Sequence, residues 1–236
     1  MTKFIALVSG KGGVGKTTTT LNLGYALTEL GRKVLLLDAN LVTPNLALQL
    51  GIVNPKGTLN QFLHKEKDLQ EITYLHESGV SIIPASPSYV EYQKTNSQKL
   101  SEVFEHLDEH AEIVLIDSPS GLGYEVSQVL KNSDEALIIV NPTLSSVMDA
   151  LKTIQLAHAH DNLVTGVILN MTNNGRNELK PEEVKAILGV PILANIKHDR
   201  KIRKAQHRHA PLGYLYPRSR SAKKLKEVAE FVTLHK

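Results

Sequence analysis

Cysteine is absent from the 236 residues of this chain. Without cysteine the chain can form no disulfide, no thiolate metal site and no cysteine-held iron–sulfur cluster. Long hydrophobic runs are also absent, because no stretch approaches the roughly 18 apolar residues that a membrane-spanning helix needs. The first residues lack the charged start and apolar centre of a secretory signal, so we expect a cytoplasmic protein.

Hydrophobic residues make up 42% of the chain, which is enough for one sizeable core. Continuous apolar stretches alternate with helical patterns, so we predict an α/β fold: a doubly wound, mostly parallel β-sheet with helices on both faces, in one domain over residues 1–236. Strands are expected at 4–9, 33–38, 80–84, 112–117, 135–140, 163–169 and 191–195. Helices are expected at 19–30, 59–63, 100–107, 145–159, 181–188 and 219–233, with a loop at 84–96.

A glycine-rich stretch separates the first expected strand from the first expected helix. It reads G-K-G-G-V-G-K-T-T and fits the phosphate-binding pattern G-x-x-x-x-G-K-[ST]. Glycines let the backbone turn its N–H groups toward a phosphate, and the following helix points its positive end at the same place. Lys16 can reach the β- and γ-phosphates, and the Thr17 hydroxyl can bind Mg²⁺. The predicted nucleotide-binding residues here are Gly10, Lys11, Gly12, Gly13, Val14, Gly15, Lys16, Thr17 and Thr18.

Polar side chains follow three of the other expected strands. Asp38 and Asp117 each end an apolar strand, and Asn170 comes directly after the strand at 163–169. Ligands of parallel sheets bind beyond the carboxyl ends of the strands, so these side chains should face the glycine-rich stretch. Asp117 is the predicted Mg²⁺ ligand beside Thr17, and we expect it to hold the ion through water.

These motifs resemble the MinD/ParA family of P-loop ATPases, and the resemblance covers most of the chain. Lys11 directly follows the first glycine, as in the family's deviant phosphate loop. Residues 117–121 resemble its second switch, D-x-P-x-G, residues 141–150 its stretch N-P-x-x-S-S-x-x-D-A, and residues 166–170 its G-x-x-x-N strand. The chain looks closest to archaeal-type MinD-like proteins that lack a C-terminal membrane-targeting helix. The resemblance implies that the cofactors are ATP and Mg²⁺.

The resemblance also implies catalytic roles. Lys11 would cross a dimer interface to the partner's nucleotide and offset transition-state charge, as an arginine finger does. Asp38 matches the family's first switch, D-x-D, but the second aspartate, which helps to position the attacking water, is Asn40 here. Asparagine can orient water but cannot accept a proton, so we expect slow hydrolysis. The predicted catalytic residues are Lys11, Lys16, Asp38 and Asn40.

Three further positions follow from the same resemblance. Pro119 and Gly121 would belong to the second switch, with the Gly121 N–H facing the γ-phosphate. Asn170 would read the adenine edge, for which an amide offers both a donor and an acceptor. The alternative for Asn170 is a residue that merely closes a strand into a turn. Lys197 stands where MinD-like proteins often have proline beside the adenine, so base contacts there are not expected from the motif.

Basic residues crowd the last fifth of the chain. Residues 196–236 carry 12 Lys/Arg against 3 acids, a net charge of +9, while the remainder carries 15 basic and 21 acidic residues, a net charge of −6. If these residues cluster, they form a surface for a polyanion such as nonspecific DNA; the alternative is a solvated face. The candidate patch consists of Arg200, Lys201, Arg203, Lys204, Arg218, Arg220, Lys223 and Lys224. The last helix has an apolar stripe typical of core packing, so we do not expect direct membrane insertion.

The function implied by the resemblance is an ATP-dependent switch for spatial positioning or partitioning, of a cell-division site, a chromosome or plasmid, or surface machinery. The expected partners are a second copy of the chain when ATP is bound and an activating or recruited protein. Through such partners the cytoplasmic protein would reach the membrane or the nucleoid. Two alternatives stay open. One is an ATP-binding adaptor with negligible hydrolysis, which recruits a partner. The other is a metallochaperone-type ATPase, which the absence of cysteine makes the weaker alternative.

Overall fold

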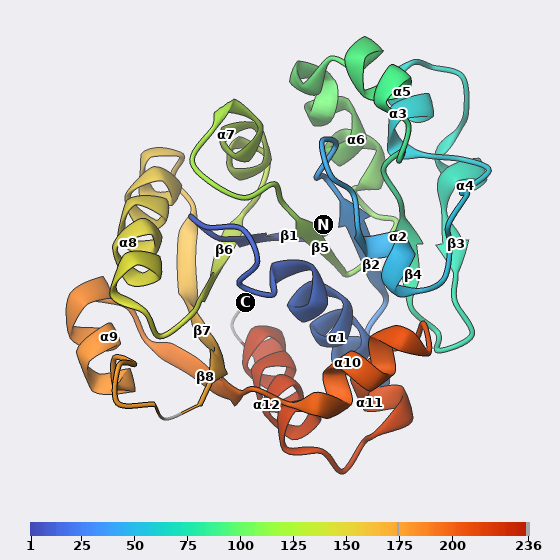
Figure 1. The fold of residues 1–236 in the computed structure, drawn as a ribbon. Helices are drawn as coiled ribbons and strands as arrows, with labels where there is room; N and C mark the ends of the chain where they lie inside the picture. Colours follow the sequence, from blue (N-terminus) through green and yellow to red (C-terminus); the bar gives the residue numbers. More distant parts are fainter. Residues whose placement is uncertain (174, 235–236) are drawn as a thin grey trace.

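An eight-stranded sheet forms the centre of the computed structural model, which describes residues 1–173 and 175–234 (Figure 1). The strands are β1 (Lys3–Val8), β2 (Val34–Asp38), β3 (Tyr74–Leu75), β4 (Ser81–Ile83), β5 (Ile113–Asp117), β6 (Glu135–Val140), β7 (Leu163–Thr172) and β8 (Ile192–Lys197). Their order across the sheet is β3-β4-β2-β5-β1-β6-β7-β8. All neighbours pair in parallel except β3 and β4, which are antiparallel. The predicted mostly parallel sheet is therefore confirmed.

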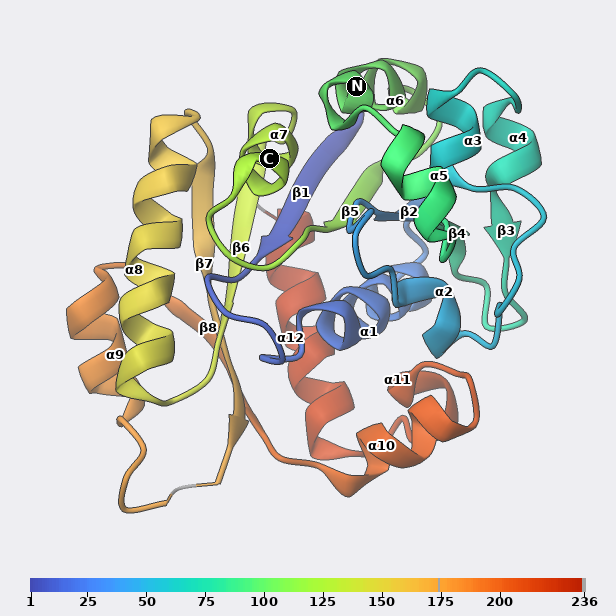
Figure 2. The same cartoon turned by 45° about the horizontal axis from the view of Figure 1, so that its top comes forward.

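Helices cover both faces of this sheet, as Figures 1 and 2 show. They are α1 (Lys16–Glu29), α2 (Leu46–Gln49), α3 (Leu59–Leu63), α4 (Leu69–Ile72), α5 (Tyr89–Lys94), α6 (Leu100–Leu107), α7 (Tyr124–Lys131), α8 (Leu144–Ala159), α9 (Pro181–Leu188), α10 (Arg200–His207), α11 (Leu212–Leu215) and α12 (Arg220–Leu234). Apolar residues of α1 and α12 pack on one face, and those of α3, α6, α7, α8 and α9 pack on the other. None of the described helices is both long and apolar enough to cross a membrane.

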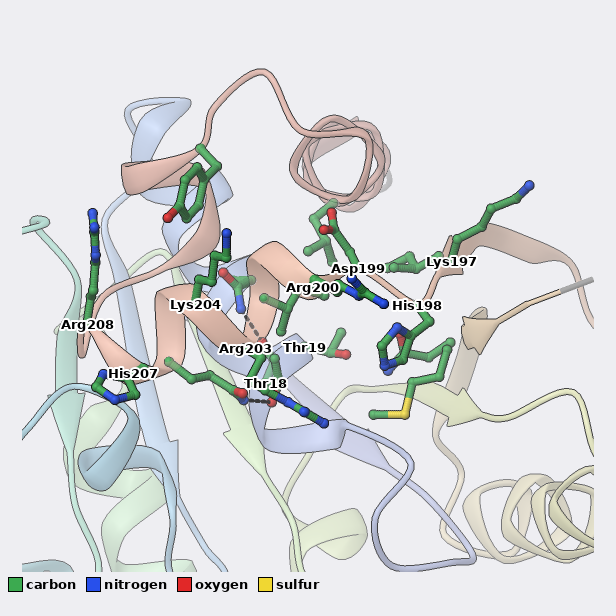
Figure 3. A pocket seen from close by; sticks show the side chains of 18 residues that line it. Thr18, Thr19, Lys197, His198, Asp199, Arg200, Arg203, Lys204, His207 and Arg208 are labelled. Carbon is green, nitrogen blue, oxygen red and sulfur yellow. Dashed lines mark hydrogen bonds between the residues drawn. The ribbon is translucent and has the colours of Figure 1, made fainter.

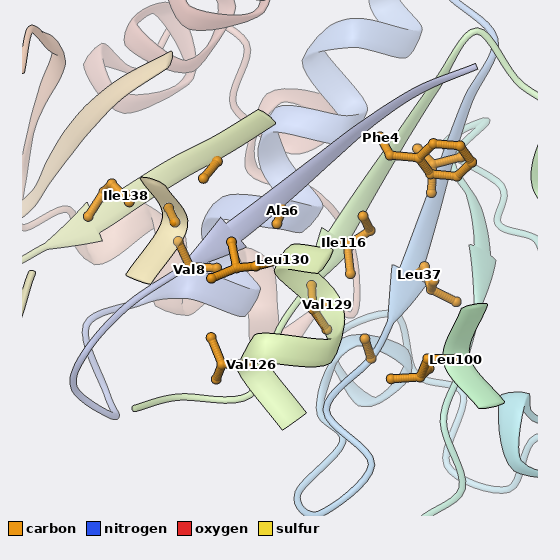
Figure 4. Close-up of a cluster of buried hydrophobic side chains, with 14 of the residues drawn as sticks. Phe4, Ala6, Val8, Leu37, Leu100, Ile116, Val126, Val129, Leu130 and Ile138 are labelled. Carbon is orange, nitrogen blue, oxygen red and sulfur yellow. The ribbon is translucent and has the colours of Figure 1, made fainter. Parts of the chain in front are cut away.

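Alternate residues of β1 enter opposite cores. Phe4, Ala6 and Val8 belong to the core beneath α6, α7 and α8, part of which Figure 4 shows, whereas Ile5 and Leu7 belong to the core beneath α1 and α12. Successive side chains of a strand point to opposite faces, so a strand buried on both sides must be apolar throughout. This requirement explains the continuous apolar stretches from which the strands were predicted.

Several helices were not predicted. Helix α5 lies inside the expected loop at 84–96, and α7 and α10 lie in stretches without a predicted element. Helix α5 buries none of its residues and α10 buries only Ala205, so neither carries a strong apolar stripe. Their starts are capped instead: the Ser88 side chain accepts a hydrogen bond from the Glu91 N–H, and the Asp199 side chain accepts one from the Lys201 N–H.

Candidate nucleotide-binding site

The phosphate loop joins β1 to α1 at the carboxyl edge of the sheet. Gly15 is the N-cap of α1 and has a φ of 93°, in the left-handed region. A Cβ atom there would lie 2.4 Å from the Asn170 Nδ2 atom, so only glycine fits. Helix α1 begins at Lys16, earlier than the predicted residue 19, and no side chain of the described residues caps it. The start of α1 can therefore receive an anion.

A cavity of about 600 Å³ opens above this loop. Residues 12–18 all line it, together with Asn40 and Ser120 from the loops that follow β2 and β5. A second cavity, of about 1000 Å³, adjoins it and shares three lining residues with it, Thr18, Met171 and Gln206. The two cavities together can take a phosphate chain and the nucleoside attached to it. Among the described residues, Gly10 and Lys11 line neither cavity.

Two carboxylates and one lysine meet beside the loop. Asp38 and Asp117 end neighbouring strands in direct register, and both are fully buried. Lys16 Nζ donates to Asp117 Oδ1 at 2.8 Å, inside the protein. Burial, together with the charge of Asp117, raises the pKa of Asp38 to about 8, although the N–H groups of Leu46 and Asn40 bond to its carboxyl group. The two buried carboxyl groups thus lie side by side, and Lys16 pairs with the one on Asp117.

The donor set fits a magnesium ion. Asp117 Oδ2 is buried and accepts no hydrogen bond from the described residues. The Thr17 side chain lines the phosphate cavity, and no partner for its hydroxyl is found within residues 1–173 and 175–234. A carboxylate oxygen and a hydroxyl are hard oxygen donors of the kind that Mg²⁺ binds beside phosphates. When bound, the ion would neutralise charge on the phosphates.

The first-switch loop after β2 is closed on itself through Asn40. Its Nδ2 atom donates to the carbonyl oxygen of Thr43 at 2.8 Å, and its Oδ1 atom accepts from the Thr43 N–H at 3.2 Å. Asn45 Nδ2 donates to the same carbonyl at 2.8 Å. Both ends of the Asn40 amide are thus engaged within the loop, although the residue lines the phosphate cavity.

Two residues predicted to contact the nucleotide form hydrogen bonds within the protein in this structure. The Gly121 N–H donates to the Ser9 carbonyl at 2.9 Å and does not face the cavity, while Pro119 and Gly121 lie in the loop after β5. Asn170 lies within β7, not after it, because this strand continues to Thr172. Asn170 Nδ2 donates to the Val14 carbonyl at 2.8 Å, so this amide supports the phosphate loop and leaves its oxygen for a nucleotide.

Gln206 was not among the predicted site residues. Its Nε2 atom donates to Thr18 Oγ1 at 2.8 Å and lies 3.5 Å from Gln49 Oε1. It therefore connects α10 with α1 and with α2 of the first-switch segment. The sequence offers one weak signal for this residue: Gln206 follows Ile202 at helical spacing, which places it on the same side of α10 as an apolar residue.

The basic residues of the candidate patch lie on two neighbouring segments. Arg200, Lys201, Arg203 and Lys204 belong to α10, whereas Arg218, Arg220, Lys223 and Lys224 lie at and before the start of α12. Ser221 Oγ donates to Asp199 Oδ2 at 3.0 Å, which holds the starts of the two helices together. Lys224 pairs with Glu227 and Lys201 lies over the Tyr216 ring, so not every member is free.

A glycine-rich phosphate loop between the first strand and first helix of a parallel sheet, with carboxylates at neighbouring strand ends, defines a P-loop nucleoside triphosphatase. The model of the ParA family, described as NUBPL iron-transfer P-loop NTPase, matches residues 1–233. The chain belongs to the ParA/MinD family of P-loop NTPases, as the sequence motifs indicate.

Individual relatives agree with this membership. An uncharacterized ATP-binding protein of Methanocaldococcus jannaschii is 36% identical over 225 residues, which cover 95% of this chain and 85% of the relative. The septum site-determining protein MinD of Pyrococcus horikoshii, solved with Mg-ADP, matches with a TM-score of 0.94 and 34% identity, covering 98% of this chain and 96% of MinD. MinD in a MinC:MinD complex of Aquifex aeolicus matches with a TM-score of 0.88 and 28% identity over 99% and 97% of the two chains.

Proposed function

We propose that this protein is an ATP-dependent dimerising switch that positions or partitions a cellular structure and hydrolyses ATP slowly. The observation that carries the proposal is the orientation of Lys11. This residue is exposed, and its Nζ atom lies 3.4 Å from Ser145 Oγ at the start of α8, outside the cavity that the other loop residues line. A lysine in the phosphate loop that does not face its own nucleotide is well placed to reach the nucleotide of a second copy.

Exposed apolar side chains around the loop support a second copy as the partner. They come from the segments after β2, β5 and β6 and from the end of β7, and they are between 39% and 60% exposed: Val42, Leu48, Leu122, Tyr124, Leu144, Met148 and Met171. Apolar side chains grouped at one edge of a monomer mark an interaction surface. In a symmetric dimer the same edge would face itself, which brings Lys11 of each copy toward the other's cavity.

The oligomeric state with different nucleotides tests this function. We expect a monomer with Mg·ADP and a dimer with Mg·ATP, because the γ-phosphate would hold the first-switch and second-switch loops in one arrangement. Size-exclusion chromatography with light scattering measures the mass directly. If the mass stays that of a monomer with ATP, while calorimetry shows that ATP binds, the dimerising function is wrong.

Replacing Asn40 with aspartate is expected to raise ATP turnover by about tenfold, because a carboxylate can accept a proton from the attacking water. It also removes the amide donor from residue 40 to the Thr43 carbonyl. Phosphate release measures the turnover. Asn45→Asp is the matched control, because its amide donates to the same carbonyl at the same distance. Unchanged turnover in Asn40→Asp would contradict the proposed role of Asn40.

The same assay separates an enzyme from an adaptor. The closed Asn40–Thr43 contacts favour the alternative of an ATP-binding adaptor with negligible hydrolysis, which would recruit a partner only while ATP is bound. Phosphate release with and without duplex DNA, anionic vesicles or a candidate partner distinguishes the two. The lack of cysteine speaks against an iron-transfer role for this chain, and the described residues contain no group of three or more His, Asp or Glu suited to a metal.

A further inference from the structure

The second cavity carries far more positive charge than a base and ribose require. Five cationic residues line it: Lys197, Arg200, Arg203, Lys204 and Arg208. Its single carboxylate, Asp199, already accepts hydrogen bonds from the Lys201 N–H and from Ser221 Oγ. None of the five cations forms an ion pair with any residue in the described ranges. Their charge is therefore available to a ligand.

These cations lie on the nucleoside side of the site. The phosphate cavity, lined by residues 12–18, is the place for the 5′-phosphates, and it meets the second cavity at Thr18, Met171 and Gln206. Ile196, Ile202, Met171 and Leu225 give the second cavity an apolar lining suited to a base. An unmodified nucleoside is uncharged, so it offers nothing for the cations around this lining to neutralise.

Three of the five cations, Arg200, Arg203 and Lys204, belong to helix α10, which is fixed at the edge of the cavity. Gln206 bonds to Thr18, and the Asp199 side chain ties the start of α10 to α12 through Ser221. In Figure 3 the Arg203 side chain runs from α10 down beside Thr18, while Arg200 and His198 lie across the cavity; Lys204 and Arg208 point away from Thr18. Arg203 and Gln206, three residues apart, share one face of α10, so the bond of Gln206 to Thr18 also holds Arg203 beside Thr18, where the two cavities meet.

The size of the cavity agrees with a larger ligand. Its volume of about 1000 Å³ is at the upper end of the roughly 300–1,000 Å³ typical of small-molecule pockets, and the 5′-phosphates have a separate cavity of about 600 Å³. A base and a ribose would therefore not fill the second cavity, and space remains in it for a further group on the ribose. The guanidinium group is well suited to bind phosphate through two parallel hydrogen bonds.

We propose that this site binds nucleotides whose ribose carries a further phosphate, on its 2′- or 3′-oxygen, and that Arg203 is the main residue that contacts this phosphate, with Arg200 beside it. The proposal rests on the proposed nucleotide binding and names a ligand class for the same site. The 5′-phosphates occupy the phosphate loop, the base lies on the apolar lining, and the additional phosphate lies between the ribose and α10.

Calorimetry with Mg²⁺ and three ligands tests the proposal: ADP, ADP with a 3′-phosphate, and ADP with a 2′-phosphate. We expect at least one phosphorylated form to bind roughly tenfold more tightly than ADP, as a charge-assisted hydrogen bond to the added phosphate implies. Arg203→Gln should remove this gain and leave ADP affinity within about threefold, because Lys16 and the main chain of residues 12–18 bind the 5′-phosphates and Arg203 does not line their cavity. Arg176→Gln, the same change on an exposed residue that lines neither cavity, should keep the gain.

The outcomes separate this proposal from the proposed function. If ADP binds and neither added phosphate increases affinity, the ligand class is wrong and the switch function stands. If the gain persists in Arg203→Gln, or if ADP itself weakens as much as the phosphorylated forms, Arg203 does not contact the added phosphate. If Arg203→Gln loses only affinity for duplex DNA, the cations belong to a polyanion surface and not to a nucleotide site. If ADP does not bind at all, the proposed function fails and the ligand class with it.

Discussion

Replacing Lys16 with alanine is expected to abolish Mg·ATP binding and also to lower the unfolding free energy of the nucleotide-free protein by about 3 kcal/mol. The first effect follows from the loss of the cation that reaches the β- and γ-phosphates. The second follows from the buried ion pair with Asp117, at 2.8 Å, in which Lys16 is 6% exposed and Asp117 is inaccessible to solvent. Calorimetry measures the binding, and urea unfolding measures the stability.

Lys16 therefore differs from an ordinary surface lysine even when no nucleotide is bound. Its removal leaves Asp117 buried beside a second buried carboxyl group, Asp38, whose pKa is already raised by burial and by the charge of Asp117. The control is Lys11→Ala, since Lys11 is exposed and its loss should change stability by no more than about 0.5 kcal/mol.

A double substitution isolates the ion pair. Lys16→Ala combined with Asp117→Asn removes both charges, so most of the lost stability should return while binding stays absent. If Lys16→Ala alone leaves the unfolding free energy unchanged, the Lys16–Asp117 pair does not hold this edge of the sheet together.

The parts of the site that could be predicted from the sequence are those formed by short runs of consecutive residues. The phosphate loop follows from nine consecutive residues, and Asp38 and Asp117 follow from apolar strands that end in a carboxylate. A parallel sheet then places these features at one edge without any knowledge of packing, because its strands all point the same way. The structure adds what the pattern could not: the two carboxyl groups stand in register, and Lys16 pairs with the one on Asp117.

Contacts between distant segments could not be predicted in this way. Asn170 supports the Val14 carbonyl across 156 residues of chain, and Gln206 reaches Thr18 across 188. Both contacts depend on how far β7 extends and on the presence of α10, a short helix whose apolar residues are only Ile202 and Ala205. Because this segment has so few apolar residues, the sequence predicted no helix there and gave only the number of its basic residues. The structure shows that Arg200, Arg203 and Lys204 of α10 line a cavity.

Replacing Lys11 with alanine is expected to lower ATP turnover by about 10³-fold and to weaken the ATP-dependent dimer, while the affinity of the monomer for ATP changes by less than about threefold. The reason is geometric: Lys11 does not line the cavity of its own chain and contacts Ser145 instead. A charge supplied by the neighbouring copy stabilises the transition state without contributing to ground-state binding within one chain.

Mixing two inactive variants tests whether Lys11 acts across the interface. A dimer of one Lys11→Ala chain and one Lys16→Ala chain retains a single intact site: the first chain binds ATP through Lys16, and the second chain supplies Lys11. We therefore expect the mixture to recover turnover that neither variant shows alone. A mixture that forms dimers by light scattering but stays inactive would show that Lys11 serves the nucleotide of its own chain. Recovered activity requires that the lysine cross from one copy to the other, because no single chain in the mixture contains both residues.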